Sequence, residues 1–224
     1  MKTILRITFI TTVLGLTQSA HALLPPEAVE FLVPEPSGRA PLAAALSING
    51  RRPSSAELPD YFEEKLWAHL PGTQKIQVME KSGKESWNYP VGTEVFHEIR
   101  LRTAEGSVPF ELRRVKKEKD QSWSFTSFSG SPWVRLDDSQ ATLPNESLQY
   151  HHPKEGAVTL NWRRIHPRNC RNCHSMRVDR EEFPTLELVG PCGFTSANPT
   201  LTHSWARDFE SVRGHSPFER VQTP

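Results

Sequence analysis

The sequence predicts a mainly β protein of the α+β class, in which an antiparallel sheet, curved or closed into a barrel, precedes a C-terminal helix. Three observations support this prediction. Apolar residues recur at every second position in several segments between residues 75 and 165, as expected for half-buried strands. Glycine-containing pairs separate these segments and predict turns. The 224 residues include 19 prolines, which disfavour long helices.

Residues 1–22 have the pattern of a secretory signal peptide. Lys2 and Arg6 form a basic start, residues 7–16 are apolar, and Ala20-His21-Ala22 resembles a cleavage site. The apolar stretch is too short for a transmembrane helix. We therefore expect an exported, soluble chain that begins at Leu23 and has no integral membrane span.

The mature chain is predicted to have three parts. Residues 23–59 are rich in proline and predict a largely irregular arm. Residues 60–165 predict a helix followed by the antiparallel β domain. The helix is expected over Asp60–Leu70, because Asp60 and Glu63 have capping-box spacing and Phe62, Leu66 and Leu70 form one apolar stripe. Residues 166–224 form the third part.

The expected strands are identified by their alternating residues, with turns at Ser82-Gly83, Glu105-Gly106 and Glu155-Gly156. The alternating apolar positions are Ile76 and Val78; Val95, Ile99 and Leu101; Phe110 and Leu112; Trp123 and Phe125; and Val158, Leu160 and Trp162. In the third part, Asn198-Pro199 predicts a helix start and Gly214 a stop, with Leu201, Trp205, Phe209 and Val212 as the buried stripe.

The most informative motif is Cys170-Arg171-Asn172-Cys173-His174, which has the C-x-x-C-H spacing of c-type haem attachment. Two thiols at this spacing can each form a thioether to a haem vinyl group. His174 then supplies the proximal imidazole to the iron. Because bacteria attach such haem after export, the motif and the signal peptide together predict one covalent haem c in a periplasmic protein.

Two other readings of the cysteines stay open at the level of the sequence. Cys170, Cys173, Cys192 and His203 form a possible Cys₃His zinc set, which would make the chain a zinc-stapled binding module. A C-x-x-C redox pair is the other reading, although no βαβ pattern surrounds it.

The layout also resembles the β-sheet haem proteins of the cytochrome c-prime-beta kind, in which a small antiparallel sheet precedes a C-terminal C-x-x-C-H. The segments that carry the resemblance, besides the motif, are residues 90–95 and Trp123-Ser124-Phe125. The resemblance covers residues 75–176 and does not extend to residues 179–224. It implies Cys170, Cys173 and His174 as haem-binding residues, and a pentacoordinate or weakly capped haem that meets small ligands such as nitric oxide.

The second axial ligand decides the chemistry, because a strong sixth ligand favours electron transfer and a vacant position favours ligand binding or conversion. His203, on the predicted C-terminal helix, is the candidate distal ligand. His97 alternates with Val95 and Ile99, which predicts a hydrogen-bonded core histidine. Met79 is predicted as a packing or solvent-facing residue, and His215 as a lesser ligand candidate. His151, His152 and His166 are predicted in loops without a special role.

Charge and local composition indicate the class of partner. The formal charge of +1 becomes −1 when Lys2 and Arg6 are removed, which does not suggest binding to nucleic acid. Six arginines surround the motif and could pair with haem propionates or dock a redox partner: Arg163, Arg164, Arg168, Arg171, Arg177 and Arg180. The sequence thus predicts a monohaem electron carrier, rather than an enzyme, that serves periplasmic redox partner proteins. The alternative is a haem protein with an open distal site for a small ligand such as nitric oxide or peroxide.

Overall fold

A computed structural model describes residues 23–31, 39–54, 56–81, 84–120, 122–130, 133–136, 145–164 and 199–221. The described chain is mainly β, as predicted, and its sheets are almost entirely antiparallel. These strands form three open sheets and no closed barrel, so the barrel alternative is not supported. No helix among these residues is long and apolar enough to cross a membrane.

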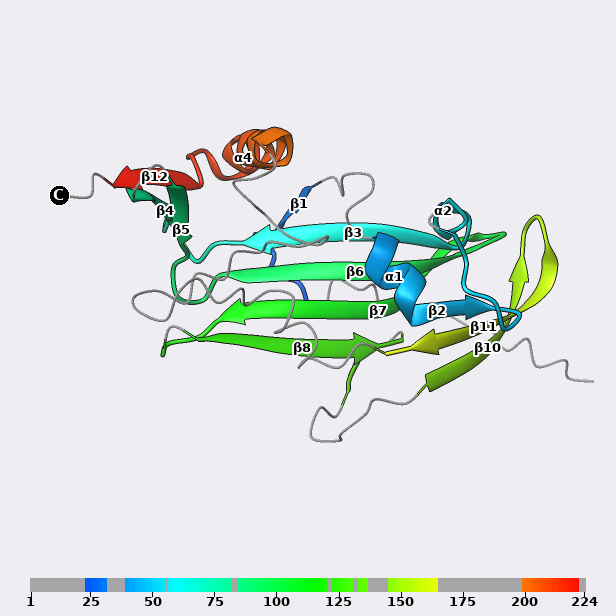
Figure 1. Cartoon of the computed structure of the whole chain (residues 1–224). Helices are drawn as coiled ribbons and strands as arrows, with labels where there is room; N and C mark the ends of the chain where they lie inside the picture. Colours follow the sequence, from blue (N-terminus) through cyan, green and yellow to red (C-terminus); the bar gives the residue numbers. More distant parts are fainter. Residues whose placement is uncertain are drawn as a thin grey trace, which may run out of the picture.

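The main sheet has six strands in the order β1-β3-β6-β7-β8-β9 (Figure 1). Its strands are β1 (Val29–Phe31), β3 (Phe62–His69), β6 (Glu94–Thr103), β7 (Gly106–Lys117), β8 (Trp123–Ser129) and β9 (Val134–Arg135). All neighbouring pairs are antiparallel. The predicted strands around Val95, Phe110 and Trp123 are therefore confirmed as β6, β7 and β8.

Two smaller sheets lie at opposite ends of the main sheet (Figure 1). The second sheet, in the order β10-β11-β2, consists of β10 (Asn145–His152), β11 (Gly156–Arg163) and β2 (Leu46–Ile48), and α1 (Arg39–Ala45) and α2 (Leu58–Tyr61) lie beside it. The third sheet, in the order β12-β4-β5, consists of β12 (Phe218–Val221), β4 (Ile76–Lys81) and β5 (Lys84–Asn88), and α4 (Pro199–Arg213) lies at this end. The pair β12–β4 is parallel, which the sequence did not predict.

The region from residue 58 to residue 70 differs from the expected helix. Only Leu58–Tyr61 is helical, and the chain then continues as β3 from Phe62 to His69. The stripe of Phe62, Leu66 and Leu70 is still buried, because residues an even number of positions apart share one face of a strand. Apolar residues at every fourth position are thus compatible with a strand as well as with a helix.

The proline-rich residues 23–59 also contribute more than an irregular arm. They contain β1, α1 and β2, and β2 pairs antiparallel with β11. Leu42, Leu46 and Ile48 are buried in the core. These residues gain their structure from packing on the sheets, which local composition does not reveal.

Three apolar clusters form the core. The α4-side cluster joins the main sheet to α4 and the third sheet, and includes Leu66, Val95, Phe125, Ile76 and Phe209. The second-sheet cluster joins the main sheet to the second sheet, and includes Phe62, Ile99, Leu101, Phe110, Leu160 and Trp162. The reverse-face cluster comprises Trp67, Phe96, Leu112 and Phe128, and Leu23, Leu24, Ala28 and Trp133 pack against it.

The C-terminal helix has the predicted start and stop. It spans Pro199–Arg213 and is followed by Gly214, whose φ of 73° is readily adopted by glycine. Phe209 is fully buried, as predicted. Val212 is 66% exposed, so its expected place in the buried stripe was wrong. The side chains of Leu201 and Trp205 lie outside the described part.

Candidate functional site

The predicted haem-binding residues Cys170, Cys173 and His174 lie outside the described residues, as do Cys192 and the signal peptide over residues 1–22. The predicted distal ligand His203 belongs to α4, but its side chain is not among those described. The structure does describe the chain on both sides of residues 165–198. It therefore shows where this motif-bearing segment leaves the fold and where it returns.

The two elements that flank this segment in the chain pack on one face of the main sheet. β11, which precedes it, packs Leu160 and Trp162 into the second-sheet cluster with Ile99 and Leu101 of β6. α4, which follows it, packs Phe209 into the α4-side cluster with Val95 of β6. Val95, Ile99 and Leu101 share one face of β6, because alternate residues of a strand point to the same side. The strand before the segment and the helix after it therefore pack near opposite ends of this face.

A polar row crosses the same face between the two clusters. It consists of Glu64 on β3, His97 on β6, Arg113 on β7 and Ser127 on β8. His97 pairs with Arg113 in the strand register, and Arg113 pairs with Ser127. His97, Arg113 and Ser127 are buried. Burying polar groups is unfavourable unless hydrogen bonds compensate, so a buried polar row between two apolar clusters marks a candidate functional site.

Glu64 and His97 form the closest contact in the polar row. Nε2 of His97 donates a hydrogen bond to Oε2 of Glu64 at 2.7 Å. Side-chain exposure is only 8% for His97 and 13% for Glu64, so the pair is largely shielded from water. The prediction of a hydrogen-bonded core histidine at position 97 is confirmed. The sequence did not identify its partner, which lies 33 residues earlier.

A second polar cluster, the Arg164 clamp, joins the main sheet to the second sheet. Arg164, the residue directly after β11, donates from Nη1 to Oε2 of Glu111 at 3.0 Å. It also donates to both carboxylate oxygens of Glu146, from Nε at 3.1 Å and from Nη2 at 2.6 Å. Its guanidinium lies 4.9 Å from the centre of the Phe110 ring. Arg164 is therefore held by strands β7 and β10 together.

Glu111 is the centre of this polar core. It is fully buried, accepts from Nε of Arg113 at 2.5 Å and accepts from the indole Nε1 of Trp162 at 2.6 Å. Burial alone would favour the neutral carboxyl group. The guanidinium groups of Arg113 and Arg164 outweigh that burial, and the pKa of Glu111 is lowered. The carboxylate is therefore charged when it binds its partners.

A β-bulge explains why the alternating pattern of the sequence did not identify Glu111 as a buried residue. Ile99 pairs with Glu111 and Arg100 pairs with Pro109, so Phe110 is an extra residue in β7. Phe110 consequently joins the second-sheet cluster, whereas Leu112 joins the reverse-face cluster. Strict alternation had placed both residues on one face. Pro109, next to the extra residue, is a local signal for such a bulge, because proline cannot donate a hydrogen bond to the ladder of an interior strand.

The other histidines have identifiable surroundings. His152 is buried against Tyr61, with ring centroids 4.3 Å apart. Its Nδ1 accepts from the backbone N–H groups of Lys154 and Glu155, and its Nε2 donates to the carbonyl of Asp60. His152 ends β10 rather than lying in a loop, and this bonding uses both ring nitrogens. His215 is half-buried beside Phe209, and His166 lies outside the described residues.

Met79 and the arginines complete the set of predicted residues. Met79 lies on β4 and is half-buried, on the opposite face of the strand from Ile76 and Val78. Arg163 is exposed. Arg164 is buried, and its guanidinium is hydrogen-bonded to Glu111 and Glu146. The remaining arginines near the motif, namely Arg168, Arg171, Arg177 and Arg180, lie outside the described residues.

Comparison with protein-family models, with curated proteins and with solved structures gives no match to this chain. The chemistry of the site must therefore be judged from its own residues. The described part contains no group of three or more histidine, cysteine or acidic residues arranged to hold a metal ion. Two thiols and an adjacent imidazole in C-x-x-C-H order have the donor chemistry for covalent haem attachment and iron ligation.

Proposed function

We propose that this chain is an exported monohaem c-type cytochrome that carries electrons between periplasmic redox partner proteins. The observation that carries the proposal is the Cys170-Arg171-Asn172-Cys173-His174 motif behind a signal-peptide pattern. Cys170 and Cys173 would hold haem c covalently, and His174 would be an axial ligand. Haem supplies one-electron iron chemistry when bound. The chain's own task is to bind the ring, orient it and limit its contact with water.

The arrangement of the fold supports this proposal. The strand before the motif-bearing segment and the helix after it pack on one face of the main sheet, through the second-sheet cluster and the α4-side cluster. Burial of a haem tunes the potential of its iron. His203 on α4 remains the candidate distal ligand for a six-coordinate carrier.

The polar row favours a second function, a haem protein with an open distal site. The Glu64–His97 pair and Arg113 are buried side by side, and such groups are typical of sites that bind or protonate a small ligand. The resemblance to cytochrome c-prime-beta proteins implies the same chemistry. The two functions differ in whether a protein side chain occupies the sixth iron position.

The deciding experiment is an absorption spectrum of the full chain exported from cells that contain the haem-attachment machinery. The protein is measured oxidised, then reduced, with and without carbon monoxide. A denaturation-resistant, low-spin Soret band whose position does not change with carbon monoxide supports the electron carrier. The His203→Ala variant then tests whether His203 is the distal ligand. A covalent high-spin haem that shifts with carbon monoxide supports the open site.

Matched variants separate these outcomes from the zinc alternative. The Cys170→Ser/Cys173→Ser variant should lose covalent haem, whereas Cys192→Ser should keep it. Absence of a haem band from the unaltered chain would contradict both haem proposals. Zinc analysis and chelator-induced unfolding would then test the Cys₃His set of Cys170, Cys173, Cys192 and His203.

A further inference from the structure

His152 lies where the hairpin of β10 and β11 meets α2, at the end of the molecule formed by the second sheet (Figure 1). It is the last residue of β10 and pairs with Gly156, so residues 153–155 form the turn of the hairpin. Its ring is 2% exposed, and its centre lies 4.3 Å from that of Tyr61 in α2. The imidazole therefore contacts both elements that meet here.

The partners of the ring define which nitrogen carries the proton. Nδ1 lies 3.2 Å from the backbone nitrogen of Lys154 and 3.1 Å from that of Glu155. A backbone N–H group can only donate, so Nδ1 is unprotonated. Nε2 lies 3.1 Å from the carbonyl oxygen of Asp60, which can only accept, so Nε2 holds the proton. The neutral ring thus joins the turn to α2.

A second proton on this ring is incompatible with these contacts. It would have to sit on Nδ1, where it would face two N–H donors and remove the acceptor of both. It would also place a positive charge on a side chain with almost no exposure to water. Burial of a charge and loss of hydrogen bonds are both unfavourable. Acid therefore opposes the closed arrangement of the turn and α2.

The charges around His152 do not offset this effect. The titratable and charged groups near the ring are Asp60 and Tyr61 on α2, Tyr150 on β10, Lys154 and Glu155 in the turn, and Arg51, Glu57 and Arg102 beside the two tyrosines. Burial raises the pKa of Tyr61 and of Tyr150, so both stay neutral. The remaining three acids and three bases leave no net charge that would favour an imidazolium.

From this geometry we propose that His152 is an acid-sensitive latch, which holds the β10–β11 turn on α2 at neutral pH and opens increasingly often as the pH falls through the range of histidine titration. The closed state excludes a proton that the open state can bind, so a lower pH favours opening. Opening uncovers Tyr61 and Tyr150, which belong to the second-sheet cluster. The latch goes beyond the proposed function and does not depend on haem.

The test is residue-resolved hydrogen exchange of the full chain between about pH 7.5 and about pH 5.5, where histidine but not carboxyl groups ordinarily titrate. The quantity compared is the protection factor of the Lys154 and Glu155 amides, corrected for the intrinsic effect of pH on exchange. His152→Gln removes the titrating ring. The matched control is His151→Gln, because His151 is the preceding residue of β10 and is exposed.

The expected result is a protection factor that falls by up to about tenfold per pH unit in the unaltered chain and in His151→Gln, which is the slope for uptake of one proton. His152→Gln should show no such fall. Nitrogen NMR spectra of the unaltered chain should also show His152 with its proton on Nε2 at neutral pH.

Two results would overturn the latch. One is a proton on Nδ1 of His152 at neutral pH. The other is the same dependence of protection on pH in His152→Gln as in the unaltered chain. Should His152→Gln fail to fold, the unaltered chain and His151→Gln decide, because a protection factor that stays constant over this pH range contradicts the latch.

Discussion

Single buried residues connect the sheets of this protein through charge. Glu111 has no exposed surface, and its carboxylate is bound by Arg113, Arg164 and the indole of Trp162. Two arginines near one carboxylate are tolerated in the interior because their charges are hydrogen-bonded and partly compensated. Removal of the carboxylate leaves these guanidinium groups without their shared partner.

Replacement of Glu111 by alanine should therefore lower the free energy of unfolding by about 3–5 kcal/mol at pH 7, because it leaves buried charge uncompensated. Urea unfolding measures this loss. Arg51→Ala is a suitable control, since the Arg51–Glu57 ion pair lies at the surface and exposed pairs contribute about 0–1 kcal/mol. Equal losses in the two variants would contradict the buried role of Glu111.

Glu111 should also make stability depend on pH. Its pKa in the folded state is lowered from 4.5, so the unfolded state takes up a proton first as the pH falls. The stabilisation is complete above about pH 4.5 and is lost as the pH falls through the folded-state pKa. The stability difference between the unaltered protein and Glu111→Gln should thus shrink below pH 4.5 in urea unfolding. A difference that is constant from pH 7 to pH 3 would exclude this assignment.

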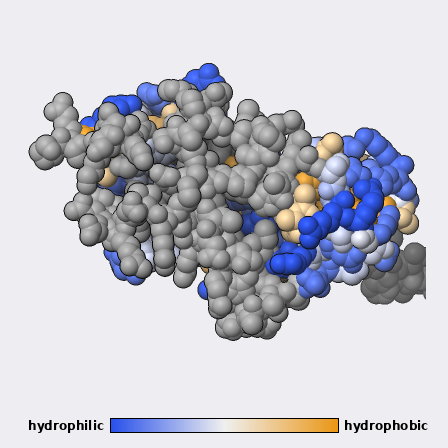
Figure 2. Space-filling view, viewed as in Figure 1, coloured by the Kyte–Doolittle hydropathy of each residue, from blue (hydrophilic) through white to orange (hydrophobic). Residues whose placement is uncertain are grey.

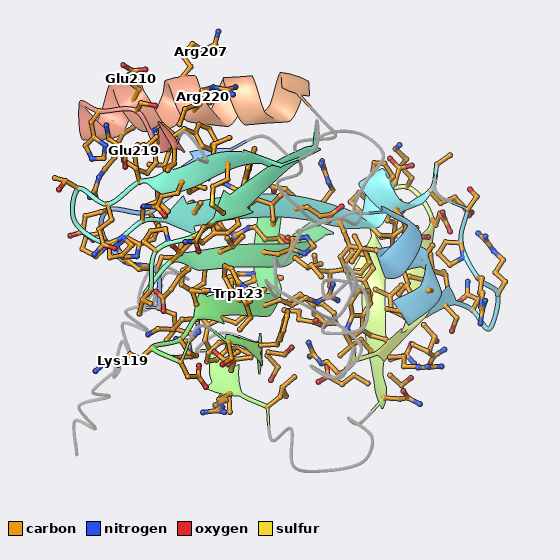
Figure 3. All side chains as sticks on the ribbon, turned by 60° about the vertical axis from the view of Figure 1, so that its left-hand side comes forward. Lys119, Trp123, Arg207, Glu210, Glu219 and Arg220 are labelled. Carbon is orange, nitrogen blue, oxygen red and sulfur yellow. The ribbon has the colours of Figure 1, made fainter. Side chains whose placement is uncertain are left out.

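Among the secondary-structure elements, α4 buries fewer apolar residues than its amphipathic sequence pattern predicts. Phe209 is fully buried in the α4-side cluster, whereas Val212, three positions later, is 66% exposed. Figure 3 shows Arg207 and Glu210 projecting from the outer side of the same helix. The apolar stripe is therefore shorter at its C-terminal end than the sequence pattern indicates.

Phe209→Ala should destabilise the protein by about 3–5 kcal/mol, because it removes a buried aromatic ring and leaves a cavity. Val212→Ala is the matched control in the same helix and should change stability by no more than about 0.5 kcal/mol. Denaturant unfolding of both variants measures the difference. Similar losses would mean that Val212 is buried in solution.

The hairpin between β6 and β7 depends on Gly106, whose φ is +130°. Side-chain-bearing residues rarely adopt this conformation, and no atom crowds the position, so substitution costs backbone strain rather than a clash. Gly106→Ala should reduce stability by about 1–3 kcal/mol. The exposed Glu105→Ala, in the same turn, should stay within about 0.5 kcal/mol. Thermal unfolding of the pair tests the assignment.

In the molecule as a whole, the second and third sheets both pack against the main sheet, at its two ends. The end formed by α1, α2 and the second sheet presents a mostly hydrophilic surface with small apolar patches (Figure 2). Strands β6 and β7 are interior to the main sheet and have ladder partners on both sides. The apolar clusters that join the sheets use residues of these strands.

Hydrogen exchange should therefore be slowest in β6 and β7 and fast in the short edge strands β1 and β9. The Cys170→Ser/Cys173→Ser variant should keep this order, because the residues of the strands and of the three apolar clusters lie outside the motif. Mass spectrometry of exchanged fragments measures both proteins. Uniformly fast exchange in the variant would mean that haem attachment is required for the fold.

The period-two strands, the turns at Glu105-Gly106 and Glu155-Gly156 and the bounds of α4 were predictable from the sequence, because each depends on local spacing or backbone preference. The sequence also identified His97 as a buried histidine and contains the C-x-x-C-H motif on which the proposed function rests. Only the tertiary structure decided that residues 62–69 form a strand, since apolar residues four apart satisfy either periodicity.

The tertiary structure likewise decided the bulge at Phe110 and the partners of Glu111, His97 and Arg164. Apart from Arg113, which is two residues from Glu111, these partners lie 18 to 53 residues away in the chain, and no local pattern encodes such a separation. The sequence defines which side chains carry the proposed chemistry. The pairing of strands and the burial of charge define where the motif-bearing segment is anchored, because both depend on contacts between distant parts of the chain.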